Sequence, residues 1–97
     1  MKKSFNEIID QKVPVLVDFT ADWCGPCKNM APILKQLKAE LKDAVSIIKI
    51  NVDNNQELAA KYQVQGVPTF MVFKNGKQTF RQSGMMSLTQ LKQVVSN

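Results

Sequence analysis

The chain has 97 residues, of which 44% are hydrophobic and 22% charged, and its 13 Lys and Arg outnumber its 8 Asp and Glu to give a net charge of +5. This length and composition predict one ordered domain over 1–97, and the apolar runs fall far short of the ~20 residues that span a bilayer. The cations are scattered and no aromatic residues interleave with them, so neither nucleic acid nor a membrane is expected as a partner.

The first half of the chain alternates helix and strand signals. A capping box that begins at Ser4 predicts a short helix over about 4–11, and the apolar run within 13–20 predicts a strand covered on both faces. Hydrophobic residues then recur at three- and four-residue spacing, which predicts a long helix over 24–42. A second run rich in Ile and Val predicts another strand over 45–52.

The second half of the chain adds a short helix, a hairpin and a last helix. The short helix is expected over about 54–62, with an asparagine cap at its start. Asn75-Gly76 is typical of a two-residue hairpin turn, and it separates two β-rich runs over 69–73 and 78–82. A second capping box, beginning at Ser87, predicts the final helix.

The expected order of elements is therefore α-β-α-β-α-β-β-α. The first two strands are joined through a helix and should pair in parallel, whereas the last two should form an antiparallel hairpin. The rules for packing layers then predict an α/β fold, in which a mixed sheet of about four strands is flanked by helices on both faces.

The two cysteines of the chain, Cys24 and Cys27, lie where the first predicted strand leads into the long helix. Unpaired N–H groups and the positive end of the helix dipole favour a thiolate there, and the thiolate is the nucleophile in disulfide exchange. Cys27 follows one helical turn later on the same face, so the two sulfurs can meet and only Cys24 needs to be exposed. In this mechanism Cys24 attacks a substrate disulfide, and Cys27 then releases the reduced substrate.

Three other uses of the cysteine pair are compatible with its residue types. A structural zinc ion needs four ligands, which two cysteines and no histidine supply only if two subunits share the site. An iron–sulfur cluster also takes about four thiolates. Two unreactive core cysteines are the third alternative, since free cysteine packs well in apolar surroundings. The position between a strand and a helix favours redox chemistry, and no metal site is expected.

Five segments follow the order and spacing of a known family. They are Val17-Asp18-Phe19, Trp23-Cys24-Gly25-Pro26-Cys27-Lys28, Met30-Ala31-Pro32-Ile33-Leu34, Gly66-Val67-Pro68-Thr69 and Phe73-Lys74-Asn75-Gly76. On these segments the chain resembles the thioredoxin family over about 5–95. Its CGPC tetrapeptide is similar to that of reducing thioredoxins, whereas glutaredoxins usually carry CPYC and protein disulfide isomerases CGHC.

The resemblance implies a thioredoxin-like fold and a protein-disulfide reductase that also carries electrons. It implies thioredoxin reductase as the electron donor, and ribonucleotide reductase, peroxiredoxins and methionine sulfoxide reductases as acceptors. No cofactor is expected beyond the Cys24–Cys27 disulfide itself, and the protein should be a monomer. Because only Met1 to Lys3 precede the first capping box, the sheet should lack the extra N-terminal strand of many thioredoxins.

Two alternative functions stay open beside the reductase. One is a disulfide oxidase or isomerase, and the other is a binding subunit that uses the thioredoxin fold without redox turnover. No apolar segment follows the basic start of the chain, so no secretory signal is expected and the cytoplasm is the simplest location.

Asp18 lies inside the apolar run of the first strand. It is either a solvent-facing residue or a buried acid, and the two-sided run favours burial, which raises the pKa of a carboxyl group. A buried Asp18 can relay a proton to or from Cys27, a role that the resemblance supports. Lys49 is either an ordinary surface lysine or, as the resemblance implies, the lysine that approaches this acid.

The resemblance also implies a docking surface around the pair. Gly25 and Pro26 would tune the motif, with Pro26 making it rigid and favouring the dithiol state. Trp23 would be partly exposed on that surface rather than buried in the core. Thr20 departs from the family, because many thioredoxins carry tryptophan there, but this change removes no chemical group.

A second part of the docking surface is implied around Pro68. The residues alone predict a turn or strand-start proline, whereas the resemblance implies a cis proline packed against the cysteines. The backbone of Val67 would then be free to pair with an extended substrate segment. Gly66 and Gly84 are otherwise turn glycines, and the resemblance gives Gly84 the further role of letting the substrate chain approach closely. Met85 and Met86, which follow Gly84, are either core or part of an adaptable docking surface.

Overall fold

The computed structural model describes residues 3–96. Its helices are α1 (Phe5–Ile9), α2 (Gly25–Leu41), α3 (Gln56–Lys61) and α4 (Leu88–Ser96), with a 3-10 turn (Lys42–Ala44) after α2. Its strands are β1 (Val15–Thr20), β2 (Ser46–Asn51), β3 (Thr69–Lys74) and β4 (Lys77–Ser83). The predicted order of helices and strands is confirmed.

The four strands form one mixed sheet in the order β2-β1-β3-β4. Strand β1 pairs in parallel with β2 and antiparallel with β3, and β3 pairs antiparallel with β4. The predicted parallel and antiparallel pairs are therefore both confirmed. The register places Asp18 of β1 directly opposite Lys49 of β2.

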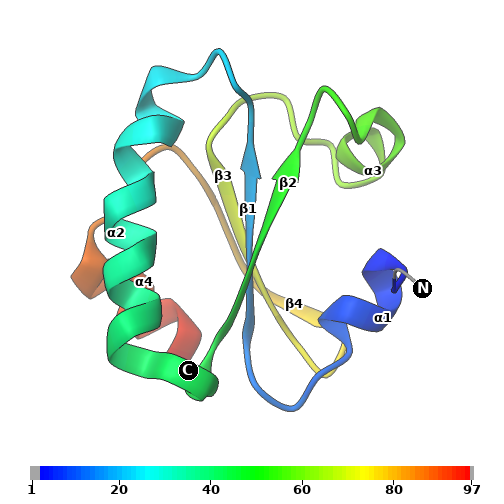
Figure 1. Cartoon of the computed structure of the whole chain (residues 1–97). Coiled ribbons are helices and arrows are strands. Elements are labelled where there is room, and N and C mark those ends of the chain that lie inside the picture. The colour runs from blue at the N-terminus through cyan, green and yellow to red at the C-terminus, as the bar shows by residue number, and fades with distance from the viewer. Residues whose placement is uncertain (1–2, 97) are drawn as a thin grey trace.

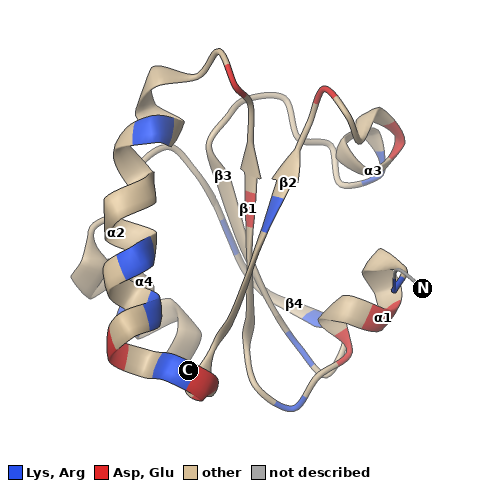
Figure 2. Cartoon of the chain, viewed as in Figure 1, with Lys and Arg blue, Asp and Glu red and all other residues tan. Residues whose placement is uncertain are grey.

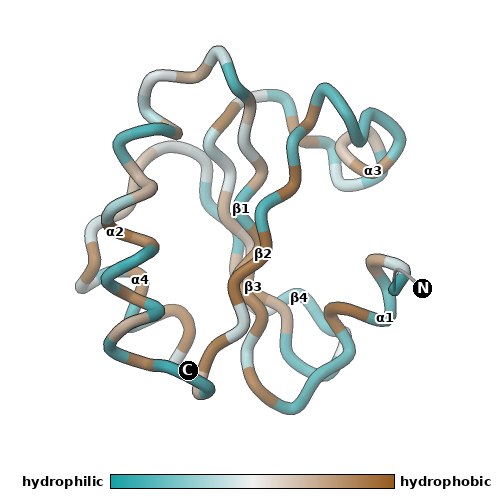
Figure 3. The backbone as a smooth tube through the Cα atoms, in the orientation of Figure 1, coloured by the Kyte–Doolittle hydropathy of each residue, from teal (hydrophilic) through white to brown (hydrophobic). Residues whose placement is uncertain are grey.

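Helices cover both faces of this sheet, with α2 and α4 on one side and α1 and α3 on the other (Figure 1). Two hydrophobic clusters fill the space between these layers. The first includes Leu16, Met30, Leu37, Phe70 and Leu91, and the second includes Ile9, Val17, Phe19, Met71 and Phe73. Neighbouring residues of one strand thus face opposite layers, which explains the continuous apolar runs. Figure 3 shows these runs as brown stretches in the middle of the molecule.

The turn between β3 and β4 has the conformation that its sequence predicts. Asn75 and Gly76 both adopt positive φ angles, 53° and 80°, as a two-residue hairpin turn requires. Their amides donate to the carbonyl oxygens of Gln11 and Ile9, at 2.9 and 3.1 Å. The turn thereby ties the hairpin to the segment that follows α1. Helix α1 ends at Ile9, before the predicted end at 11. The carbonyl oxygens of Ile9 and Gln11 accept hydrogen bonds from the hairpin turn rather than from a continued helix.

The start of α3 differs from its predicted cap. Asn55 occupies the cap position, but its side chain makes no hydrogen bond to an amide of the helix. The Nδ2 atom of Asn55 instead donates to the carbonyl oxygen of Asn51, at 2.9 Å. The prediction that an asparagine side chain caps α3 is therefore wrong for Asn55, because this side chain binds the end of β2 instead.

Both predicted capping boxes are present. At α4, the Ser87 hydroxyl accepts from the Gln90 amide at 3.1 Å, and the Gln90 side chain accepts from the Ser87 amide at 2.9 Å. The same reciprocal pair links Ser4 and Glu7 at α1. Each box satisfies amides that the first turn of a helix leaves without partners.

We expect Ser87→Ala to lower the free energy of unfolding by about 1 kcal/mol, because it removes the acceptor at the start of α4. Urea unfolding followed by far-UV circular dichroism measures this change. Thr89→Ala, an exposed change within the same helix, is the matched control and should stay within about 0.5 kcal/mol of the parent. Equal effects of the two substitutions would contradict a stabilising cap.

The charged residues are spread over the fold. Figure 2 shows Lys and Arg on helices and strands alike, with acidic residues among them. None of the helices within residues 3–96 is both long and apolar enough to cross a membrane.

Candidate active site

The cysteine pair lies where β1 ends and α2 begins, as predicted. Cys24 is the N-cap residue of α2 and has an extended backbone, and Cys27 lies in the first turn. The two are joined by a disulfide, with Cα atoms 5.3 Å apart. The helix start thus holds the second sulfur one turn behind the first.

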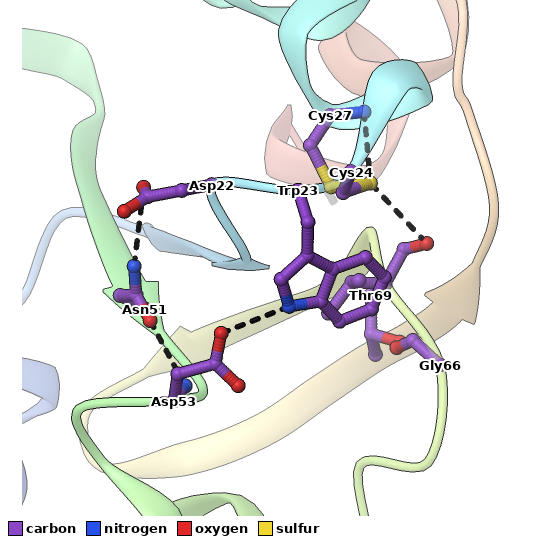
Figure 4. The surroundings of a disulfide bond; sticks show 9 residues. Asp22, Trp23, Cys24, Cys27, Asn51, Asp53, Gly66 and Thr69 are labelled. Atoms are coloured by element: carbon purple, nitrogen blue, oxygen red, sulfur yellow. Dashed lines mark hydrogen bonds between the residues drawn. A yellow bond between two sulfur atoms is a disulfide. The ribbon is translucent and has the colours of Figure 1, made fainter.

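The Cys24 sulfur acts as the cap of the helix. It accepts a hydrogen bond from the backbone N–H of Cys27, with 3.1 Å between nitrogen and sulfur (Figure 4). Pro26 in the same turn has no N–H that would need a partner. An N–H donor and the positive end of the helix dipole both stabilise negative charge, so the reduced pair should carry its thiolate on Cys24.

The disulfide is less accessible than the sequence predicts. Cys24 and Cys27 are only 4% and 7% exposed, so the expectation of an exposed Cys24 is wrong for the oxidised form. Both pack in a small cluster with Ala21, beside Val52 and Val67. A partner must therefore dock closely around the disulfide in order to reach it.

The segment before β3 faces the pair. The Cys24 sulfur lies 3.6 Å from the carbonyl oxygen of Val67, a contact that becomes a possible S–H donation only in the thiol form. The Val67–Pro68 peptide bond is cis, as the resemblance implies. Within residues 3–96 the Val67 N–H makes no hydrogen bond. The Gly84 N–H donates to the Pro68 carbonyl at 2.8 Å, which brings the end of β4 beside this proline.

Three of the predicted site glycines border open space. A Cβ atom built on Gly25, Gly66 or Gly84 would meet no atom within 4 Å. Gly84 also has a φ angle of 94°, in the region that side chains rarely adopt. Gly66, next to Val67, and Gly84, which binds Pro68, therefore leave room at the surface on the side of the disulfide where Val67 lies.

Trp23 projects from the molecule directly before Cys24. Its side chain is 70% exposed, which excludes the core alternative. The indole nitrogen donates to a carboxylate oxygen of Asp53 at 2.9 Å (Figure 4). Met85, which follows Gly84, is also exposed, at 46%, whereas Met86 is buried in the core.

Asp18 is buried, as predicted. It is 2% exposed, and its Oδ1 atom has no hydrogen-bond partner among the described residues. Burial raises the pKa of Asp18 from 3.8 to about 6, and the positive charge of Lys49 partly offsets that increase. Lys49 lies opposite Asp18 in the sheet, and its charge acts on the Asp18 carboxyl group. The lysine residue itself is exposed.

Asp18 lies on the side of the sheet that α2 covers. Leu16, two residues earlier on β1, packs in the cluster with α2, and side chains two apart share a face. Thr20, two residues later, lines a surface groove of about 440 Å³ together with Cys27 and Lys49. Cys27 and Lys49 thus border one groove, and the buried Asp18 lies opposite Lys49, on the same face of β1 as the Thr20 that lines this groove.

Sequence reasoning missed a polar network beside the pair. Asn51 binds Asp22 in the loop before α2 and the backbone of the loop that holds Asp53 (Figure 4). These residues belong to segments far apart in the chain, and no periodicity or motif joins them. In the described part of the chain, no three His, Cys, Asp or Glu side chains are grouped to hold a metal ion.

The comparisons with known proteins agree with this geometry. The family model named Thioredoxin matches residues 1–97. Thioredoxin 1 of Chlorobaculum tepidum is 42% identical over 96 residues, which cover 98% of this chain and 95% of that protein. The chloroplastic thioredoxin Y2 of Arabidopsis thaliana is 42% identical over 99% of this chain and 60% of its own length.

Solved structures give the same result. A mutant thioredoxin from Halobacterium salinarum matches with a TM-score of 0.85 and 36% identity, over 94% of this chain and 79% of that one. The oxidised mitochondrial thioredoxin 3 of Saccharomyces cerevisiae matches with a TM-score of 0.85 and 34% identity, over 95% of this chain and 85% of that one. The fold and the sequence therefore point to the same relatives.

Proposed function

This chain belongs to the thioredoxin family of oxidoreductases that act on protein disulfides, and we propose that Cys24 is its attacking thiol and Cys27 its resolving thiol. Its activity is thiol–disulfide exchange at this redox-active pair. The two roles are assigned from one hydrogen bond, in which the backbone N–H of Cys27 donates to the Cys24 sulfur at the helix start. Gly25 and Pro26 complete the turn that holds this geometry.

The first step uses the stabilised thiolate. The Cys24 thiolate attacks one sulfur of the substrate disulfide, so that a mixed disulfide forms and the other substrate sulfur leaves as a thiolate that takes up a proton. The helix start lowers the cost of the anion before attack. Because both cysteines are nearly buried, the substrate must dock before this step.

The second step requires a thiolate on Cys27. Its proton passes to the carboxylate of Asp18, directly or through water, and the new thiolate attacks the Cys24 sulfur. The mixed disulfide breaks, the second substrate sulfur leaves as a thiolate that takes up a proton, and the Cys24–Cys27 disulfide forms, which completes a two-electron transfer. An acid with a pKa of about 6 is a suitable acceptor near neutral pH, and Lys49 limits the rise of that pKa.

Substrate docking falls to the residues around the disulfide. Trp23 offers an exposed apolar face, and the free N–H and the carbonyl of Val67 can pair with an extended substrate segment. Gly66 and Gly84 leave open space for that segment, and Pro68 holds the Val67 backbone beside the sulfur.

The partners follow from the family. Interaction with thioredoxin reductase and with disulfide substrates is general in this family. As specific acceptors we propose ribonucleotide reductase, peroxiredoxins and methionine sulfoxide reductases. We also propose that this protein acts as a monomer. One similar solved structure concerns the thiol-resolving mechanism of a yeast mitochondrial 1-Cys peroxiredoxin through the glutathione and thioredoxin systems, which supports peroxiredoxins as acceptors. Thioredoxins carry no cofactor beyond the cysteine pair.

The proposed location is the cytoplasm, a reducing compartment in which a dithiol can be regenerated. Bacterial relatives support this location, while relatives from rice and Arabidopsis are named chloroplastic.

The reduction potential of the Cys24–Cys27 pair tests the direction of electron flow. We expect a value near about −270 mV, which is typical of thioredoxin, together with catalysis of insulin reduction by dithiothreitol. A value near about −120 mV would instead identify an oxidant. Absence of any insulin reduction by the folded dithiol would favour a binding subunit.

A further inference from the structure

Asn51, the last residue of β2, lies between the two loops beside the cysteine pair (Figure 4). Its Nδ2 atom donates to Asp22 Oδ1 at 3.3 Å, in the loop between β1 and α2. Its Oδ1 atom accepts from the amides of Asp53 and Asn54, at 2.9 and 3.3 Å. One amide side chain thus ties the loop that carries Trp23 to the loop after β2.

The second link of this network reaches Trp23. Asp53, whose backbone is held by Asn51, accepts from the indole N–H at 2.9 Å. Because the indole is 70% exposed, packing alone leaves its orientation loosely restrained. Within the described residues the indole makes no hydrogen bond other than the one to Asp53, which therefore fixes the direction of the ring.

We propose that Asn51 is a positioning residue of the thioredoxin reaction, which holds Asp53 and thereby keeps the Trp23 indole in the orientation that receives substrate. This inference rests on the proposed docking role of Trp23. Asn51 itself contacts neither sulfur, so its effect should fall on substrate binding rather than on the exchange steps.

An amide suits this position better than the other polar side chains. It supplies one donor for Asp22 and one acceptor for the Asp53 and Asn54 amides. It also carries no charge between two carboxylates, whereas an aspartate would add a third negative charge and lose the donor. We call the hydrogen bonds of the Asn51 side chain to Asp22, Asp53 and Asn54 the Asn51 bridge. Alanine at this position removes both the donor and the acceptor of the bridge.

The test compares Asn51→Ala with the matched control Asn54→Ala. The Asn54 side chain makes no hydrogen bond with residues 3–96, so its removal leaves the bridge intact. For insulin reduction we expect Asn51→Ala to raise KM about tenfold and to change kcat less than about twofold. Because the chain has one tryptophan, its fluorescence reports on Trp23 alone, and its anisotropy should fall in Asn51→Ala only.

A double-mutant cycle then separates positioning from general weakening of the fold. Trp23→Phe keeps an aromatic ring but removes the indole N–H that Asp53 accepts. In that background, Asn51→Ala should raise KM by no more than about twofold, because the side chain it positions is already released. Thermal unfolding of each variant confirms that it is folded at the assay temperature.

The proposal is overturned if Asn51→Ala leaves KM and Trp23 anisotropy at parent values. It is also overturned if the effect on KM is equally large with Trp23→Phe, because Asn51 would then act through another route. If the parent protein itself fails to reduce insulin, the proposed function fails, and the anisotropy of the two variants still decides whether Asn51 holds the indole.

Discussion

Replacing Cys24 with serine abolishes catalytic disulfide reduction, with a loss of at least about a thousandfold in turnover. A serine hydroxyl stays protonated near neutral pH, so the helix start has no sulfur anion to stabilise. The backbone N–H of Cys27 donates to the sulfur of Cys24 in the parent, so the remaining Cys27 thiol lacks this stabilising donor. Insulin reduction with dithiothreitol, followed by turbidity, measures the loss.

The companion variant is Cys27→Ser, which should also lose turnover but at a later step. It keeps the attacking Cys24 and lacks the thiol that resolves the mixed disulfide. Both variants should remain folded in the reduced state, as far-UV circular dichroism can verify. Cys24→Ser that retained a tenth or more of the parent turnover would contradict the role of Cys24.

Replacing Asp18 with asparagine stabilises the protein near pH 8 relative to the parent. Burial raises the pKa of Asp18 from 3.8 to about 6, so the ionised acid is unfavourable in the folded state. The contribution of Asp18 to stability is fully present below the pKa of the unfolded chain and is lost as pH rises through about 6. A neutral asparagine of similar shape avoids this loss.

The difference in unfolding free energy should therefore grow with pH. Between about pH 4 and pH 8, the advantage of Asp18→Asn should increase by about 2 kcal/mol. The full pKa difference is worth about 3 kcal/mol, at about 1.4 kcal/mol for each unit, but part of it is already lost at pH 4, where the acid of the unfolded chain is more than half ionised. Urea unfolding of the oxidised proteins across this range measures it. Asp43→Asn, which changes an exposed carboxylate, should show no such growth. A constant offset between parent and Asp18→Asn would mean that the acid titrates normally.

The layers of the fold were predictable because they depend on local patterns. The apolar run of β1 required cover on two faces, and Leu16 and Val17 do pack into opposite clusters. Asn75-Gly76 determined its hairpin through the positive φ angles that these residues tolerate. The end of α1 was not predictable, because it depends on amides of that distant turn.

The centre of the active site was also predictable, since Cys24 and Cys27 are close in sequence and the helix start defines their geometry. The burial of Asp18 followed from its apolar neighbours. The near burial of Cys24 did not, because Val67 covers it from a segment 43 residues away. A strand-to-helix motif contains no information about what packs against it.

The polar bridge at Asn51 shows the same limit more clearly. Asparagine at the end of a strand is typical of any turn, and nothing in the sequence marks its bond to Asp22. Only the pairing of β1 with β2, which places Thr20 opposite Asn51, brings the two loops together. Residues that act through tertiary contacts therefore need the structure before a role can be assigned.

The proposed mechanism requires that the Cys24 sulfur is the first to bond to a substrate. A trapping experiment compares the two single variants directly. Each reduced variant is mixed with a protein disulfide, quenched with acid after a series of times, and weighed by mass spectrometry. We expect Cys27→Ser to form a covalent adduct with the substrate rapidly, and Cys24→Ser to form it slowly or not at all. Faster adduct formation by Cys24→Ser would show that the attacking sulfur is Cys27 and would contradict the mechanism.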